Sequence, residues 1–399
     1  MNRKNAPLNR LYGALFFLLL PLSGFAVAAD SVQSFLDRHW FRPIPPQGIA
    51  PKHFSDVEAA LDPESCGTCH ADQLADWKGS RHARAMDPGV LGQLLDMDQS
   101  NRGDHQDCLR CHAPLAEQAD GLVAQMKGKN TNGLQQHGMI CAACHVRNNE
   151  RFGPPRKDDS SPQPGDFLPH NGFTASAAFQ DSRFCASCHQ FEPGNFSLNG
   201  KLLENTYEEW KSSRYGQEGK QCQSCHMPDR RHLWRGIHDA ETVKNGVAVT
   251  SFMKITQGHV LGSLMIRNTA VGHYFPTYAT PMIYLDIFQE DRRGKVVAGT
   301  LSRHAIGRKV PPDISSEIFD TRLAPDAEHV HSYDRPLHPT TVSIVARVRV
   351  EPDAFYAGFY RSLLASGATR KGKTLIRQAL KQANASAFEI YLERYPVKH

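Results

Sequence analysis

Five short stretches decide the fold of this chain: CGTCH at 66–70, CLRCH at 108–112, CAACH at 141–145, CASCH at 185–189 and CQSCH at 222–226. Each has two cysteines three positions apart and a histidine directly after the second. Together they use all ten cysteines of the 399-residue chain. A pattern that repeats five times without exception indicates one chemical purpose.

C-x-x-C-H is the attachment signature of c-type haem. Two thiols at this spacing each add to a vinyl group on one edge of a porphyrin, and the following imidazole reaches the iron as an axial ligand. We therefore predict five covalently bound haem c groups. The predicted attachment residues are Cys66, Cys69, Cys108, Cys111, Cys141, Cys144, Cys185, Cys188, Cys222 and Cys225, and the predicted proximal ligands are His70, His112, His145, His189 and His226.

Three other uses of paired cysteines explain the pattern less well. Structural zinc takes four protein ligands, which leaves an odd fifth pair and the repeated histidine without a role. A disulfide within C-x-x-C closes only a tiny loop. Thioredoxin-type motifs do not occur five times in one chain with a fixed histidine.

Each iron has a second axial position, and the histidines outside the motifs are candidates to fill it. His105 lies near the second motif without supporting context, and we interpret Met227 as structural. The candidates outnumber the irons by one, so the sequence leaves open whether one iron lacks a second protein ligand. They are His82, His232 and His238 beside the first and last motifs, His273 further on, and His137 and His170 ahead of the third and fourth motifs.

The first 29 residues have the pattern of an export signal. Arg3, Lys4 and Arg10 precede a short apolar stretch, and an A-x-A-like site follows at 26–28. We expect cleavage after Ala28 or Ala29 and a periplasmic location. Without this segment the formal charge of +5 falls close to neutral, and no basic stripe indicates nucleic-acid binding. Beyond it, no apolar run is long enough to span a bilayer.

The rest of the chain divides by pattern. Residues 30–60 form a lead-in, 61–240 a pentahaem domain, and 241–399 a β-rich domain. We predict a mainly α, loop-rich haem domain followed by a β-sandwich-like C-terminal domain with terminal helices. The expected helices are 72–78, 90–97, 114–126, 207–213, 353–366 and 373–383, the expected strands are 247–256, 263–268, 282–289, 295–300, 329–333, 341–350 and 387–395, and 154–165 is expected to be a loop.

The first motif, followed by WKGSRHA at 77–83, resembles the multihaem cytochrome c family. That family includes the tetrahaem electron acceptor of hydroxylamine oxidation, hydroxylamine oxidoreductase and pentahaem nitrite reductase. Residues 182–190, 207–213 and 222–228 are similar in the same way, and the resemblance covers 66–238. It implies distal ligands at His82 and in the pair His232 and His238.

Departures from the family limit what the resemblance implies. The catalytic haem of pentahaem nitrite reductase has a lysine in place of the motif histidine, whereas all five motifs here end in histidine. The likeness therefore supports the fold and the haem packing rather than either enzymatic activity. The segment GHYFPT around His273 resembles one found in exported multihaem proteins with a C-terminal β-domain.

We expect a periplasmic pentahaem cytochrome that carries electrons along closely packed, mostly bis-histidine haems between redox partners in the periplasm or the membrane. A second hypothesis is an oxidoreductase with one open iron that acts on a small nitrogen or sulfur compound. A third is a filament subunit assembled through the β-domain. The sequence does not decide the oligomeric state.

Overall fold

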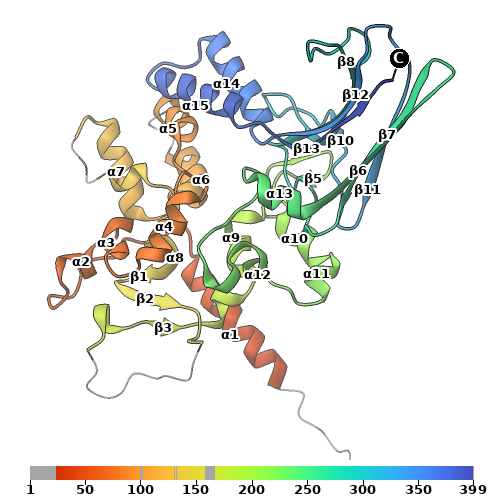
Figure 1. The fold of residues 1–399 in the computed structure, drawn as a ribbon. Helices are drawn as coiled ribbons and strands as arrows, with labels where there is room; N and C mark the ends of the chain where they lie inside the picture. The colour runs from red at the N-terminus through yellow and green to blue at the C-terminus, as the bar shows by residue number, and fades with distance from the viewer. Residues whose placement is uncertain (1–23, 99–101, 130, 132, 158–166, 399) are drawn as a thin grey trace, which may run out of the picture.

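The computed structural model describes residues 24–98, 102–129, 131, 133–157 and 167–398 (Figure 1). The predicted export signal lies mostly outside these residues, because the first described helix, α1, begins at Gly24. Most of the predicted loop at 154–165 also lies outside them. Within the described residues, no helix combines the length and the apolar character needed to cross a membrane.

The described residues up to 246 are built mainly from short helices and turns. Polar residues begin several of the helices: the side chain of Asp87, for example, accepts the backbone N–H groups of Gly89 and Val90 at the start of α5. The helices are α1 (Gly24–His39), α2 (Asp56–Ala59), α3 (Pro63–Gly67), α4 (Ala71–Gly79), α5 (Pro88–Asp96), α6 (Arg102–His112), α7 (Ala116–Met126), η1 (Leu134–Gln136), α8 (Cys141–His145), η2 (Pro169–Asn171), η3 (Ala177–Gln180), α9 (Arg183–His189), α10 (Thr206–Lys211), α11 (Arg214–Gln217), α12 (Cys222–His226), η4 (Pro228–Arg230) and α13 (Ala240–Gly246).

Five short strands interrupt these helices and form two small sheets, in the orders β1-β2-β3 and β4-β5. With the larger sheets that follow, they make the described chain a mixture of α and β structure rather than a mainly α protein. The short strands are β1 (Val146–Arg147), β2 (Glu150–Gly153), β3 (Thr174–Ala175), β4 (Ser197–Leu198) and β5 (Lys201–Leu202).

The C-terminal part contains two larger antiparallel sheets and two helices. One sheet has the strand order β10-β9-β8-β12-β13 and the other has the order β11-β7-β6. The elements are β6 (Val247–Thr256), β7 (His259–Asn268), β8 (Met282–Glu290), β9 (Ser302–Lys309), β10 (Phe319–Asp320), β11 (Glu328–Pro336), β12 (Ser343–Glu351), α14 (Ala354–Ser366), α15 (Lys373–Ala385) and β13 (Phe388–Pro396).

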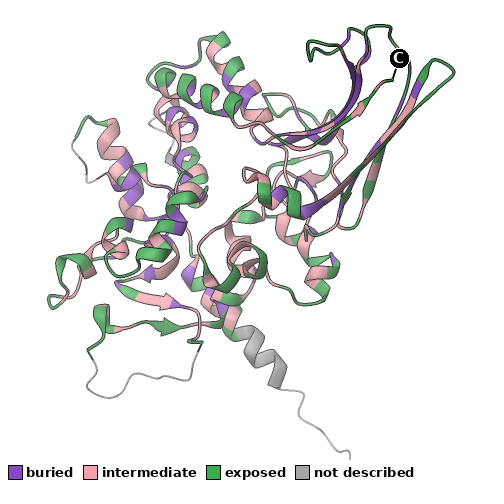
Figure 2. Ribbon diagram, viewed as in Figure 1, coloured by how far each residue is buried: buried purple, intermediate pink, exposed green. Residues whose placement is uncertain are grey.

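The two larger sheets share one apolar core. Leu264 and Ile266 of β7 pack in the same cluster as Ile283 and Leu285 of β8, and all four are fully buried. Figure 2 shows the buried residues running along β8 and β12, the central strands of the five-stranded sheet. Burial of this kind contributes about 25 cal/mol per Å² of apolar surface, so the shared core fixes the two sheets against each other.

The predicted strand at 295–300 is wrong. Asp291 instead forms a turn by accepting the backbone N–H groups of Arg293 and Lys295, and the chain makes only one bridge there, between Glu290 and Val296. The strand that pairs with β8 is β9, which begins at Ser302. Residues 295–300, although they alternate in polarity, therefore form the connection that precedes β9.

Helices α14 and α15 connect the C-terminal part to the helical part by packing on α5. Asp96, at the end of α5, accepts the backbone N–H groups of Arg370 and Gly372 at 3.0 Å. A Cβ at Gly372 would overlap the backbone carbonyl of Gly92, and a Cβ at Gly92 would lie 2.9 Å from the Cδ1 of Ile376. This close backbone approach requires glycine at both positions for steric reasons.

Replacing Gly372 with alanine should destabilise the protein by about 1–3 kcal/mol, because the added methyl group has no space between two backbones. The control is Gly358→Ala in α14, where a Cβ meets nothing within 4 Å. This control should be neutral or stabilising by about 0.5–1 kcal/mol through helix propensity. Thermal unfolding of both variants checks the prediction, and equal melting temperatures would contradict it.

Candidate haem sites

The five motifs place their cysteines and histidines on short helices. In α6, α8, α9 and α12, the two cysteines lie one turn apart on one face and the histidine ends the helix. The first motif is split, because Cys66 lies in α3 whereas His70 precedes the first turn of α4. None of the ten cysteines, all of which lie in the described residues, is joined to another by a disulfide.

Hydrogen bonds orient three of the motif histidines. The Nδ1 atoms of His112, His145 and His226 donate to backbone carbonyls of Ala85 at 2.5 Å, Phe152 at 2.7 Å and Arg235 at 2.8 Å, respectively. Because a carbonyl only accepts, each Nδ1 carries the proton and each Nε2 keeps its lone pair. This is the arrangement expected of imidazoles that bind a metal through Nε2.

Three of the predicted distal histidines each lie opposite a motif histidine. The ring centres are 6.2 Å apart for His82 and His189, 6.2 Å for His145 and His232, and 6.4 Å for His226 and His273. A metal–nitrogen bond of about 2 Å plus about 1 Å from nitrogen to ring centre puts two axial imidazoles roughly 6 Å apart. The three spacings therefore fit one iron between each pair.

Five of these six histidines are half-buried and His189 is exposed. For the five, the loss of contact with water favours the neutral form. It lowers the pKa of His82 to about 3 and the pKa values of His145 and His273 to about 4. Burial is also the main cause of the lowered pKa values of His226 and His232. A neutral imidazole has the free lone pair that a metal ligand needs.

The other three predicted distal ligands do not lie opposite a motif histidine. The ring of His137 is 6.3 Å from that of Trp77. The Nδ1 of His170 bonds to the carbonyl of Gly172 at 2.8 Å. The Nε2 of His238 lies 2.9 Å from the carboxylate of Asp353. In the described part of the chain, neither His70 nor His112 has an imidazole opposite it at the spacing seen in the three pairs.

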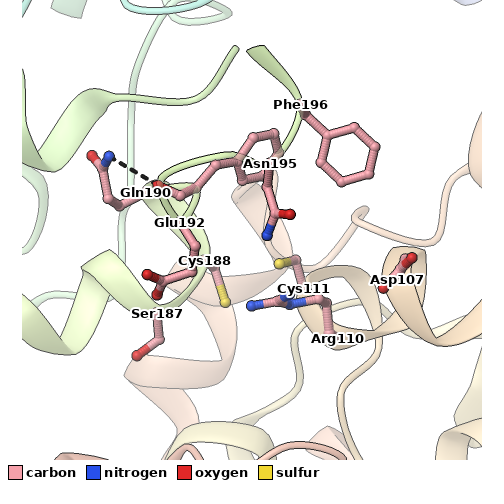
Figure 3. A pocket seen from close by; sticks show the side chains of 10 residues that line it. Asp107, Arg110, Cys111, Ser187, Cys188, Gln190, Glu192, Asn195 and Phe196 are labelled. Atoms are coloured by element: carbon pink, nitrogen blue, oxygen red, sulfur yellow. Dashed lines mark hydrogen bonds between the residues drawn. The ribbon is translucent and has the colours of Figure 1, made fainter. Parts of the chain in front are cut away.

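Cysteines of different motifs also lie close to one another. The thiols of three such pairs lie close enough to affect each other's pKa: Cys66 and Cys141, Cys111 and Cys188, and Cys185 and Cys222. Cys111 and Cys188 line a small pocket that also includes Gln190, whose amide donates to the carbonyl of Phe191 (Figure 3). Since each of these sulfurs would hold a porphyrin edge, neighbouring cysteines of different motifs would hold two haems near each other.

Two residues of the lead-in belong to these sites but were not predicted from the sequence. Arg42 donates to the sulfur of Cys188 at 3.1 Å, and the Nε2 of His39 lies 2.8 Å from the carbonyl of Cys144. His39 is 3% exposed and stacks on Phe35. The sequence signal was weak, because both residues lie far along the chain from the motifs that they contact.

Comparison with known proteins finds likeness in part of the sequence and in the fold. Residues 65–146, which contain the first three motifs, match the family described as "Cytochrome c554 and c-prime". The fold resembles the crystal structure of a penta-heme cytochrome c552 from Thermochromatium tepidum, with a TM-score of 0.61 and 19% sequence identity over 86% of this chain and 100% of that chain. A search of curated proteins finds no match.

The short helices present five C-x-x-C-H motifs in the manner of c-type cytochromes. The matched segment and the structural likeness together support a multihaem cytochrome c family for this chain. At 19% identity the likeness to the penta-heme protein concerns the fold alone.

Proposed function

We propose that the protein is a periplasmic pentahaem electron carrier that passes electrons between redox proteins of the periplasm or the membrane. The observation that carries this proposal is the set of three imidazole pairs with ring centres 6.2–6.4 Å apart. A haem bound between such a pair supplies an iron that accepts and releases one electron without needing a substrate.

The proximity of cysteines from different motifs supports an order in which the haems would neighbour one another. Cys66 and Cys141 join the first and third sites, and Cys185 and Cys222 join the fourth and fifth. Cys144 of the third site packs in one cluster with Cys188 of the fourth. We therefore propose an electron path through sites one, three, four and five, with site two joined to site four through Cys111.

The protein around these sites controls the potentials. Two histidines and no methionine at each of the three paired sites favour low reduction potentials. In this proposal residues 61–240 hold the haems and residues 241–399 form the second domain, which contributes His273 to the fifth site. The Nδ1 of His273 bonds to the carbonyl of Tyr274 at 2.8 Å, which orients its Nε2 away from that carbonyl.

The test combines intact mass with electron paramagnetic resonance. The oxidised protein should weigh five haems more than the processed chain and should show low-spin ferric signals from the paired sites. His82→Ala should turn one low-spin haem high-spin with no loss of haem mass, because the thioether bonds remain. His259→Ala is the matched control, since His259 is exposed and pairs only with Asp334 at 3.0 Å. An unchanged low-spin signal in the His82 variant would refute the ligand pairing.

A second candidate function is catalysis at one open iron. The observation that favours it is that His70 and His112 lack an opposite imidazole among the described residues. A small nitrogen or sulfur compound would then bind at the free axial position. The wild-type ferric protein should in that case show a high-spin signal that such a compound converts to low spin, whereas five low-spin haems would exclude this candidate.

A further inference from the structure

A short sequence occurs twice in the haem-binding part and folds the same way each time. Residues 76–81 read DWKGSR and residues 209–214 read EWKSSR. In both copies the serine hydroxyl donates to the tryptophan carbonyl, at 2.7 Å for Ser80 and 2.6 Å for Ser213. In both copies the serine hydroxyl oxygen also accepts the backbone N–H of the residue three positions later, at 3.3 Å. The two segments are thus one structural unit used twice.

The acidic residue that begins each copy binds the backbone next to a distal histidine. Asp76 accepts the backbone N–H of His232 at 3.0 Å and forms a two-pronged ion pair with Arg231, at 2.6 and 2.7 Å. Glu209 accepts the backbone N–H of Tyr274, the residue after His273, at 3.1 Å.

Glu209 has further partners around His273. Its carboxylate accepts the hydroxyl of Thr277 at 2.7 Å and the Nη1 of Arg322 at 2.9 Å. The Asp76 and Glu209 side chains are 6% and 4% exposed, so both carboxylates are shielded from water. A buried carboxylate with several charge-assisted hydrogen bonds fixes the groups that it binds far more firmly than an exposed one does.

We propose that the repeated segment is a clasp whose carboxylate positions the distal ligand of another haem site: Asp76 positions His232 opposite His145, and Glu209 positions His273 opposite His226. Asp76 and Glu209 are positioning residues, because they act through the backbone of the ligand. This proposal depends on the proposed function only in that these two imidazole pairs each bind a haem iron. It explains why acidic side chains are kept buried in helices that bear no haem ligand of their own.

If the clasp is correct, removing either carboxylate should free the distal axial position of one specific iron. Glu209→Ala should let one haem more than in the wild type bind carbon monoxide in the reduced protein. Glu208→Ala is the matched control, since Glu208 is exposed and pairs with Lys211 at 3.1 Å. Asp76→Ala should open one haem in the same way, with Asp72→Ala on the same helix as its control.

Variants of the ligand itself separate failure of the clasp from failure of the pairing. His273→Ala should open one haem, and adding Glu209→Ala to it should open no more, because both changes act on one iron. If His273→Ala opens none, the pairing with His226 is wrong. If it opens one but Glu209→Ala opens none, the clasp is overturned.

A more conservative substitution at Glu209 serves as the control for a folding defect. If Glu209→Ala does not accumulate as holoprotein, Glu209→Gln replaces it, because the amide oxygen still accepts one N–H while the ion pair with Arg322 is lost. At equal haem content, Glu209→Gln should bind more carbon monoxide than Glu208→Gln. Equal binding by these two variants would overturn the proposal.

Discussion

Replacing Arg308 with leucine should destabilise the protein by about 3–5 kcal/mol, more than the other substitutions considered, because it removes a buried ion pair with Glu317 and leaves several carbonyls without their donor. The Arg308 side chain lies in β9 and is fully buried. Its Nε donates to Glu317 at 2.8 Å, and its two Nη atoms donate to the carbonyls of Leu198, Lys201 and Leu202 at 2.5–3.0 Å.

These carbonyls belong to the β4–β5 hairpin, which lies between the fourth and fifth haem motifs. Arg308 therefore ties the haem-binding part to the β-rich part through one guanidinium group. Lysine cannot replace it, because an ammonium group lacks the planar fork that reaches several acceptors at once. Arg308→Lys should accordingly recover only part of the lost stability.

Thermal unfolding followed by the Soret band checks this prediction. The matched control is Arg349→Leu in β12, where the side chain is 39% exposed and lies 3.3 Å from Glu351. An exposed pair of this kind contributes about 0–1 kcal/mol, so the control should unfold close to the wild type. If the Arg308 and Arg349 variants unfold at the same temperature, Arg308 does not hold the two parts together.

The sequence predicts what depends on local pattern. The limits expected for β6 agree with the structure at both ends, Val247 and Thr256, because its residues alternate between the shared core and the outside. Helices α14 and α15 and strand β13 are likewise confirmed to within a few residues. Strand β9 was missed, since the turn at Asp291 and the alternating residues after it imitate a hairpin.

The haem-site pairing could not be predicted, because it depends on contacts between residues far apart in the chain. His82 lies more than a hundred residues from His189, and nothing near either residue specifies the other. The buried carboxylates are harder still to find, since Asp76 and Glu209 look like the polar face of a short helix. Their partners, His232 and Tyr274, become visible only when the chain is folded.

The free energy of unfolding should fall as the pH rises from about 4.5 to 7, because the buried carboxyl of Glu204 resists ionisation in the folded protein. Burial raises the pKa of this carboxyl to about 7 from the usual 4.5, although the Thr206 hydroxyl donates to it and the charge of Arg322 favours its ionised form. Desolvation outweighs both effects, so the folded protein prefers the neutral acid.

The sign follows from proton binding. Below pH 4.5 the carboxyl is neutral in both the folded and the unfolded chain, and the full stability is present. Between 4.5 and 7 only the unfolded chain releases the proton, so the folded state loses about 1.4 kcal/mol per pH unit, or roughly 3 kcal/mol in all. Above pH 7 the loss is complete and stays constant.

Glu204→Gln should remove this dependence, because an amide keeps the shape and the acceptor oxygen of the acid but does not ionise. The variant should match the wild type near pH 4.5 and exceed its free energy of unfolding by roughly 2–3 kcal/mol at pH 8. Glu192→Gln is the control, since Glu192 is exposed nearby. If Glu204→Gln and the wild type differ by the same amount at both pH values, the Glu204 carboxyl is not held neutral by burial, and Thr206 and Arg322 determine its charge instead.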